Sequence, residues 1–461
     1  MLRKEITLDF TNVINSRYGI TEKQLDRQLN LLPERIKRLR AIRPEIMKRE
    51  KAYKDLVKDE GNIRQVRKVI ARMKGHWENL VVLGIGGSAL GNIALQTALN
   101  PYMYNFDKEQ RSGPRIFVID NIDPAQLVSF LKWLDNELDR TMFNVISRSG
   151  TASETMSQLF IIRDLLQKRG AQHFRKQVIV TTCFDENPLH RIALKEGLEH
   201  LEIPKYVGGR FSILSPVGLF SADMCKIKVK SLIEGARDMK RHCGRISRSN
   251  PAAVIAAIHH SLYQKGKRIA VMMPYSYELK DMADWFRQLW AESLGKAEDV
   301  NGNQLPVPIG PTPVRALGAT DQHSQLQLYI DGIDDKVFAF LQVDKFKKDP
   351  PIGKIPHYTP ELEYLENSTL GELYQIEKEA TETVLFEKKR PCFSIIFPEV
   401  NPYTVGQFIY LYETVTFYTG AFFGINPFDQ PGVGAIRDRI THLMVLAKSK
   451  RSKRKRKSNR S

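Results

Sequence analysis

Short apolar runs alternate with helix-length amphipathic segments along most of the 461-residue chain, and this alternation limits the possible fold more than any other feature. The runs of a first series are NLVVLGIGG at 79–87, RIFVID at 115–120, FNVIS at 143–147 and QVIVTT at 177–182. Those of a second series are KRIAVMMP at 267–274, KVFAFLQV at 336–343 and PCFSIIF at 391–397. Apolar strands separated by helices are typical of βαβ units with parallel sheets. The sequence therefore predicts an α/β protein with two αβα sandwiches in tandem.

The two series are separated by a connection at 203–217 that contains glycine and proline. Before about residue 75 the chain is charge-rich and its apolar residues recur at helical spacing, so we expect helices and no strand there. We predict an N-terminal helical segment at 1–60, a first α/β domain at 61–202, a second at 203–447 and a disordered basic tail at 448–461.

The formal net charge of +18 is typical of a nucleic-acid-binding protein, but its distribution weakens that interpretation. Nine Lys or Arg residues and no acid lie in 448–461, so the tail carries half of the excess charge. A solvated tail is the favoured interpretation, and weak contact with nucleic acid or an anionic membrane surface is the alternative. We therefore do not expect a nucleic-acid partner for the folded part of the chain.

Composition also indicates a cellular compartment. The N-terminal sequence MLRKEITLDF lacks the apolar region of a signal peptide, and no apolar run approaches the roughly 20 residues of a membrane helix. The cysteines form no CxxC pair, which argues against a disulfide framework and against a zinc site. They are Cys183, Cys225, Cys243 and Cys392. We expect a soluble cytoplasmic protein that binds neither a membrane nor a metal.

The segment VVLGIGGSALG at 81–91 is a strand that runs into a glycine-rich turn and a helix. Glycines allow a ligand to approach the backbone closely, and a helix N-terminus offers free N–H groups to an anion. The spacing nearly fits a dinucleotide fingerprint, but the next strand-terminal acid, Asp120, lies about thirty residues on instead of about twenty. The turn therefore favours an anion, with a tight βα connection as the alternative.

The segment VISRSGTASET at 145–155 is a second candidate anion site. Thr151 and Glu154 have the spacing of a capping box, which predicts that a helix starts there. The Ser-Arg-Ser run at 147–149 would then surround the helix N-terminus with donors and a positive charge, as a phosphate requires. A helix cap without a ligand is the alternative.

Three further segments could supply acid–base or electrostatic chemistry, although each has a structural alternative. On the predicted helix 278–296, Gln288 and Glu292 lie one turn apart and opposite the apolar stripe, where a solvated glutamate is favoured in isolation. His323 follows Thr320, a candidate N-cap, and is a candidate acid or base. Arg210, in the sequence VGGRFS, could approach a ligand oxygen, but alone it is uninformative.

The segment NPFDQPGVGAIR at 426–437 breaks the chain and then begins a helix. Its apolar residues Val433, Ile436, Ile440 and Leu443 are expected to point inward. Arg437 would flank this stripe, and a half-buried cation needs an anionic partner, which could be a ligand or a structural carboxylate.

No single motif identifies a protein family, but six motifs in a fixed order do. They are GIGGSALG, SRSGTASET, VGGRFS, QLWAESLGK, TDQHSQLQ and FDQPGV. With them, from about residue 50 to 445, the chain resembles the phosphoglucose isomerase family, most closely its shorter bacterial type. The resemblance implies two SIS-type (sugar isomerase) αβα domains, a homodimer with the active site between subunits, and a reaction of glycolysis and gluconeogenesis without metal or organic cofactor.

The resemblance further implies an aldose–ketose isomerase that interconverts glucose 6-phosphate and fructose 6-phosphate through an enediolate. Glu292 would carry the proton between C2 and C1, Arg210 would stabilise the enediolate, and His323 of the partner subunit would assist ring opening. The residues that would bind substrate or its phosphate are Gly87, Ser88, Ser147, Arg148, Ser149, Thr151, Gln288 and Gln430.

Several positions depart from the family pattern. Arg437 replaces a lysine that helps ring opening; because Arg stays protonated, we predict that it contributes only electrostatics and that His323 is the principal ring-opening acid. Ala152 replaces a phosphate-binding Thr, which predicts weaker phosphate binding, partly offset by Arg148 in place of a Lys. Nothing explains Gly434 in place of a Glu. The alternative function is a catalytically impaired paralogue that binds sugar phosphates as a sensor.

Overall fold

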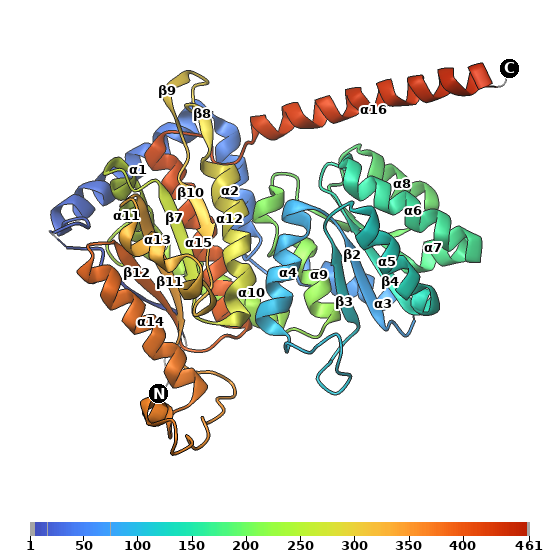
Figure 1. Ribbon diagram of the computed structural model, residues 1–461. Coiled ribbons are helices and arrows are strands. Elements are labelled where there is room, and N and C mark those ends of the chain that lie inside the picture. Colours follow the sequence, from blue (N-terminus) through green and yellow to red (C-terminus); the bar gives the residue numbers. More distant parts are fainter. Residues whose placement is uncertain (1–4, 16, 74, 459–461) are drawn as a thin grey trace.

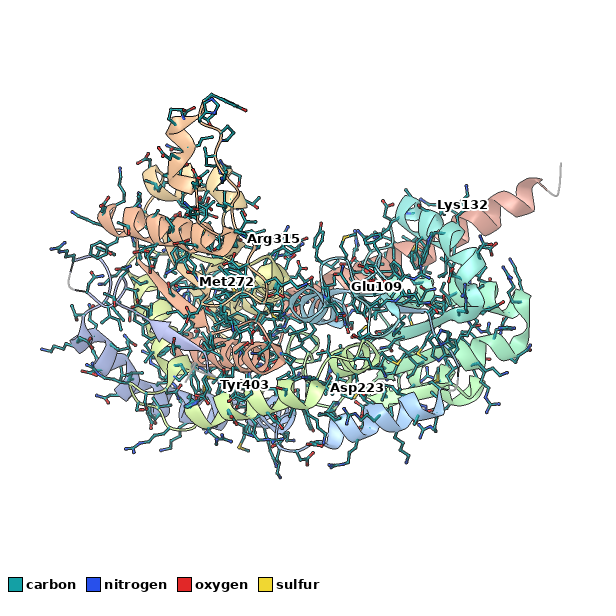
Figure 2. All side chains as sticks on the ribbon, turned by 90° about the horizontal axis from the view of Figure 1, so that it is seen from below. Glu109, Lys132, Asp223, Met272, Arg315 and Tyr403 are labelled. Carbon is teal, nitrogen blue, oxygen red and sulfur yellow. The ribbon has the colours of Figure 1, made fainter. Side chains whose placement is uncertain are left out.

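The computed structural model describes residues 5–15, 17–73 and 75–458, and it shows two lobes, each built around a five-stranded sheet (Figure 1). The first sheet is parallel throughout, with the order β3-β2-β4-β5-β6. Its strands are β2 (Asn79–Leu83), β3 (Arg115–Ile119), β4 (Thr141–Ile146), β5 (Val178–Thr182) and β6 (Glu199–Glu202). Figure 2 shows the lobes side by side from another direction, with Lys132 in the first and Met272 in the second.

The second sheet has the order β1-β12-β11-β7-β10 and is parallel except at one edge. There β1 pairs antiparallel to β12 and places Thr7 opposite Ile396. The strands are β1 (Thr7–Asp9), β7 (Ile269–Pro274), β10 (Thr312–Arg315), β11 (Lys336–Val343) and β12 (Cys392–Phe397). A separate two-stranded ribbon is formed by β8 (Lys296–Glu298) and β9 (Gln304–Ile309).

Helices surround both sheets (Figure 1). Those that precede or belong to the first lobe are α1 (Glu22–Ile42), α2 (Pro44–Asp55), α3 (Gly61–Arg72), α4 (Leu90–Leu99), α5 (Pro124–Leu134), α6 (Ser153–Arg169), α7 (Ala171–Gln177), α8 (Pro188–Glu196) and α9 (Pro216–Met224). Those that follow are α10 (Val229–His242), α11 (Pro251–Gln264), α12 (Lys280–Leu294), α13 (Leu326–Asp331), α14 (Leu370–Glu387), α15 (Pro402–Phe423) and α16 (Pro431–Ser458). Single 3₁₀ turns that matter below are η1 (Gly86–Ser88), η3 (Gly209–Phe211) and η5 (Thr320–His323).

Both faces of the first sheet are buried, as continuous apolar strands require. Val81 and Leu83 of β2 pack with Leu159 of α6 on one face. Leu80 and Val82 point to the other face and join the large core that α3, α4 and α9 share with the second lobe. Because α4 also packs against α12, the two lobes meet along these helices and hold the loops between them in fixed positions.

α15 is the central helix of the second lobe. Every residue from Tyr403 to Phe422 is buried, and the helix packs against α1, α10, α11 and α12. It carries Glu413, whose carboxyl oxygens have no hydrogen-bond partner among the described residues. Burial raises the pKa of Glu413 well above its usual value, so this side chain is kept neutral in the fold.

The predicted α/β class with parallel sheets is confirmed, and the seven apolar runs correspond to β2, β3, β4, β5, β7, β11 and β12. The expectation of helices alone before residue 75 is wrong, because β1 adds a short edge strand to the second sheet. The strands β6 and β10 were also not expected; both are short and lie at sheet edges, where less burial leaves a weaker apolar pattern.

α16 differs most from expectation, because it leaves the second lobe as one long helix that runs above the first lobe in the view of Figure 1 (red). The predicted inward stripe is exposed, with Val433 at 41%, Ile436 at 63%, Ile440 at 37% and Leu443 at 52%. Only the beginning of α16 lies against the body. The helix continues through Ser458, into the segment 448–461 for which a disordered tail is predicted. The domain boundaries stay predictions.

Candidate active site

A cavity of about 580 Å³ lies between the lobes, beyond the carboxyl ends of β2 and β4. Parallel α/β sheets place their ligands at this end of the strands. The first lobe contributes 85–88, 146–149 and 152–155 to the wall, and the remainder comes from Arg49 of α2, 208–210, α12, the loop 428–430 and the first turns of α16. Segments from six separate parts of the sequence therefore meet at one site.

Two glycines allow the turns around the cavity to come together. A Cβ on Gly87 would lie 2.3 Å from the carbonyl carbon of Gly209, so η1 and η3 touch backbone to backbone. Gly86 has a φ of +57°, and a Cβ there would lie 2.9 Å from Nε2 of Gln288. The glycine-rich motif therefore lets the turn after β2 approach Arg210 and Gln288 closely. The sequence alone does not show whether such glycines make room for another part of the protein or for a ligand.

The turn after β4 forms part of the cavity wall. Arg148 donates through Nη2 to the carbonyl oxygen of Lys205 at 2.7 Å, while its Nε has no hydrogen-bond partner among the described residues. Burial lowers the pKa of Arg148, and the positive charge of Arg49 contributes further. Ser147 and Ser149 line the cavity beside Arg148. These groups can serve an anion with free donors and a positive charge.

The helix that follows this turn begins one residue later than predicted. α6 starts at Ser153 with Ala152 as its N-cap, and no side chain caps it, so the capping box of Thr151 and Glu154 is wrong. Thr151 instead donates through its hydroxyl to Oγ of Ser149 at 2.9 Å and does not line the cavity. The uncapped start of α6 leaves backbone N–H groups for an anion.

Glu292 lies on α12 in the wall of the same cavity, with its side chain 29% exposed. Its Oε1 accepts a hydrogen bond from Nε2 of Gln288, one turn earlier, at 2.9 Å. Its Oε2 lies 3.4 Å from Nη1 of Arg210. A carboxylate held between an amide and a guanidinium is oriented towards the cavity and can accept a proton there.

Arg210 is only 4% exposed and donates a hydrogen bond to five different acceptors. The acceptors are Oγ of Ser293, Oε2 of Glu292, Oε1 of Gln430 and the carbonyl oxygens of Pro427 and Asp429. Burial lowers the pKa of Arg210 to about 10, although the nearby carboxylates of Glu292 and Asp429 act in the opposite direction and raise it. The guanidinium is therefore a fixed cation at neutral pH, and this orientation places positive charge next to the carboxylate.

Sequence reasoning missed several supporting residues. Ser293 anchors Nε of Arg210 at 2.7 Å, and Lys296 donates to the carbonyl oxygens of Glu292 and Asp429 at 2.9 Å each, which joins the end of α12 to the loop 428–430. Both lie in the motif QLWAESLGK, which indicated that they are near the site but did not indicate which groups they contact. Arg49 of α2 also lines the cavity, and nothing in its sequence context indicated this.

The structure brings ten of the twelve predicted site residues to this one cavity. They are Gly87, Ser88, Ser147, Arg148, Ser149, Arg210, Gln288, Glu292, Gln430 and Arg437. Thr151 and His323 are not among its lining residues. His323 is exposed at the end of η5, where Thr320 is the first residue of the turn and not its N-cap.

Among the described residues, no group of three or more His, Cys, Asp or Glu side chains could hold a metal ion. Within the same residues, no helix is long and apolar enough to cross a membrane.

Comparisons with known proteins agree on one family. The sequence matches the family model of phosphoglucose isomerase over residues 21–459. It is 45% identical to a glucose-6-phosphate isomerase of Carboxydothermus hydrogenoformans over 81% of this chain and 80% of that protein. It is 36% identical to a glucose-6-phosphate isomerase of Rubrobacter xylanophilus over 96% and 98%. The structure also matches a crystal structure of a hypothetical protein from Thermus thermophilus with a TM-score of 0.84 and 32% identity, covering 96% of this chain and 100% of that one.

Proposed function

Because this chain belongs to the phosphoglucose isomerase family, we propose that it interconverts glucose 6-phosphate and fructose 6-phosphate. The observation that carries the proposal is the cavity that joins the carboxylate of Glu292, the guanidinium of Arg210 and the Ser-Arg-Ser turn 147–149. A phosphorylated sugar can place its phosphate at the turn and its C1 and C2 atoms near the carboxylate. The reaction is a step of glycolysis and gluconeogenesis.

In the aldose-to-ketose direction, Glu292 removes the proton from C2 while the carbonyl oxygen at C1 takes up negative charge. A double bond forms between C1 and C2, and the enediolate oxygen faces the cation of Arg210. Glu292 then returns the proton to C1, and the hydroxyl proton on the oxygen at C2 moves to the oxygen at C1, so that C2 becomes the carbonyl and C1 carries the hydroxyl. A carboxylate is a weak base towards a carbon acid, so the fixed guanidinium must supply much of the stabilisation in the transition state.

The phosphate end supplies orientation. Donors from Ser147, Arg148, Ser149 and the uncapped start of α6 hold the remote phosphate, so that C1 and C2 meet Glu292 in a reactive geometry. Gln288 keeps one carboxylate oxygen in place, and Gln430 shares Arg210 with it. Arg437, on the exposed start of α16, adds positive charge at the rim of the same cavity.

The proposed function is tested with the purified protein and fructose 6-phosphate. Glu292→Gln keeps the shape of the side chain and removes the base, so kcat should fall by about 10²–10⁴-fold with substrate binding retained. Glu298→Gln is the matched control, because this exposed carboxylate lies six residues further on, outside the cavity. Activity of Glu292→Gln within tenfold of wild type would refute the assignment. A wild type that binds the sugar phosphate without turnover would identify a sensor instead.

The homodimer with a shared site forms a second part of the proposal. The exposed His323 does not line the cavity of its own chain. A second subunit that presents its own His323 would complete the site. Four free, buried cysteines support a reducing compartment, the cytoplasm, for this assembly.

Subunit mixing tests the shared site. Glu292→Gln chains and His323→Ala chains are each impaired, but a mixed dimer would hold one site with both wild-type residues. Random mixing after unfolding and refolding should therefore recover about a quarter of wild-type activity. No recovery, in a preparation shown to contain mixed dimers, would place both residues of a site on one chain.

A further inference from the structure

We propose that Arg49 of α2 is a second cation for the substrate phosphate, acting together with Arg148. The inference rests on the proposed function, since it takes the ligand to be a sugar phosphate. It assigns a substrate-binding residue to the N-terminal helices, a part of the chain to which no motif points.

Arg49 lies in the wall of the cavity with its side chain 22% exposed. Its Nε and Nη2 both donate to one oxygen of Glu45, at 2.9 and 2.7 Å. Nη1 has no partner among the described residues, so this edge of the guanidinium is free for a ligand. Glu45 itself is 60% exposed and lies outside the cavity lining. It can therefore orient the guanidinium of Arg49 without blocking the access of a ligand to it.

α2 packs beside the loop that fixes Arg148. The ammonium group of Lys48 lies 5.7 Å from the ring centre of Tyr206, and the preceding residue, Lys205, accepts the hydrogen bond from Arg148. The neighbours of Arg49 and of Arg148 are therefore in contact. The electrostatics agree, because after burial the charge of Arg49 has the largest effect on the pKa of Arg148.

The charge of the ligand explains why two cations are needed. A phosphate monoester carries about −1.5 to −2 at neutral pH, so Arg148 alone leaves it partly uncompensated. Two guanidinium groups that face one cavity repel each other, and an anion between them removes that repulsion. Nε of Arg148 is also without a partner among the described residues. Arg49 thereby offsets the hydroxyl donor that is missing at Ala152.

The test measures the KM for fructose 6-phosphate and the binding of inorganic phosphate by calorimetry. Arg49→Gln should raise KM and the phosphate Kd by about tenfold each, with kcat within about twofold, the size expected for one charge-assisted hydrogen bond at a partly exposed site. Lys51→Gln is the matched control, because it removes one positive charge from an exposed position of the same helix outside the cavity. An equal effect of both variants would overturn the inference.

Glu45→Gln separates binding from structure. It keeps Arg49 and an amide oxygen that can accept its hydrogen bonds, and it removes only the negative charge, so the phosphate Kd should stay the same or fall. A rise that matches Arg49→Gln would mean that the ion pair only supports α2, and it would refute a contact with phosphate. Because calorimetry needs no turnover, a failure of isomerase activity in the wild type would refute the proposed function and leave the role of Arg49 measurable.

Discussion

Replacing Arg210 by lysine separates the charge of this residue from its geometry. Lysine keeps the positive charge but has three donors, whereas the guanidinium serves five acceptors in a planar fork. At least two of these acceptors lose their donor. Leaving a buried acceptor without a partner costs about 1–3 kcal/mol, and water can reach the cavity side, so we expect the free energy of unfolding to fall by about 3 kcal/mol.

The same substitution should lower kcat by about 10²–10³-fold, the loss seen when one fixed donor to a developing oxyanion is removed. The assay compares kcat and thermal midpoint with those of Arg390→Lys. Arg390 also donates to backbone carbonyl oxygens, those of Ile330 and Gly332, but lies outside the cavity. The control should therefore lose stability and keep kcat. An Arg210→Lys enzyme with kcat within threefold of wild type would show that Arg210 is structural, and the mechanism above would be refuted.

Three further substitutions test other parts of the structure. Gly87→Ala should lower kcat/KM at least tenfold with a smaller change in midpoint, because a Cβ 2.3 Å from the carbonyl carbon of Gly209 forces η1 and η3 apart; unchanged kinetics would contradict this close contact. Glu413→Gln should raise the unfolding free energy more at pH 7 than at pH 5. Because the pKa of Glu413 is higher in the folded state than in the unfolded state, its contribution to wild-type stability is fully present below the unfolded-state pKa and is lost as the pH rises towards the folded-state pKa. A difference in stability between variant and wild type that does not change with pH would refute a neutral Glu413. Arg437→Lys should accelerate ring opening, measured as anomer exchange by NMR, because lysine can donate the proton that arginine retains; an unchanged or slower rate would contradict a purely electrostatic Arg437.

Much of the first lobe could be predicted from sequence, because its strands are buried on both faces and read as continuous apolar runs. The edge strands β1, β6 and β10 could not, since their residues are partly exposed and their pairing is set by distant neighbours. The stripe of α16 has the spacing of a packed helix, yet packing depends on what lies opposite, and beyond its first turns no second element of the described chain lies there (Figure 1). A periodic pattern predicts a helix better than it predicts the partner of that helix.

The same distinction applies to the site. Gln288 and Glu292 could be placed together because they lie one helical turn apart, and helix geometry alone fixes that neighbourhood. That Arg210 reaches them, and that Arg49 lines the same cavity as Arg148, depends on how segments more than 80 residues apart in sequence pack together, which no local pattern encodes.

The arrangement of charge in the cavity explains why one carboxylate can carry the proton in both directions. Glu292 must be ionised to accept the proton from C2 and must then release it to C1, so it cannot be bound too strongly in either state. Its hydrogen bond from Gln288 is neutral, and the contact with Arg210, at 3.4 Å, is long for an ion pair. Arg210 is held mainly by four other acceptors, so its charge remains available to an enediolate oxygen that replaces Gln430 or Glu292 as its partner. The fixed guanidinium can therefore stabilise negative charge first on the carboxylate and then on the substrate oxygen. Because Arg210 need not move between these states, the intermediate is stabilised at little cost in reorganisation.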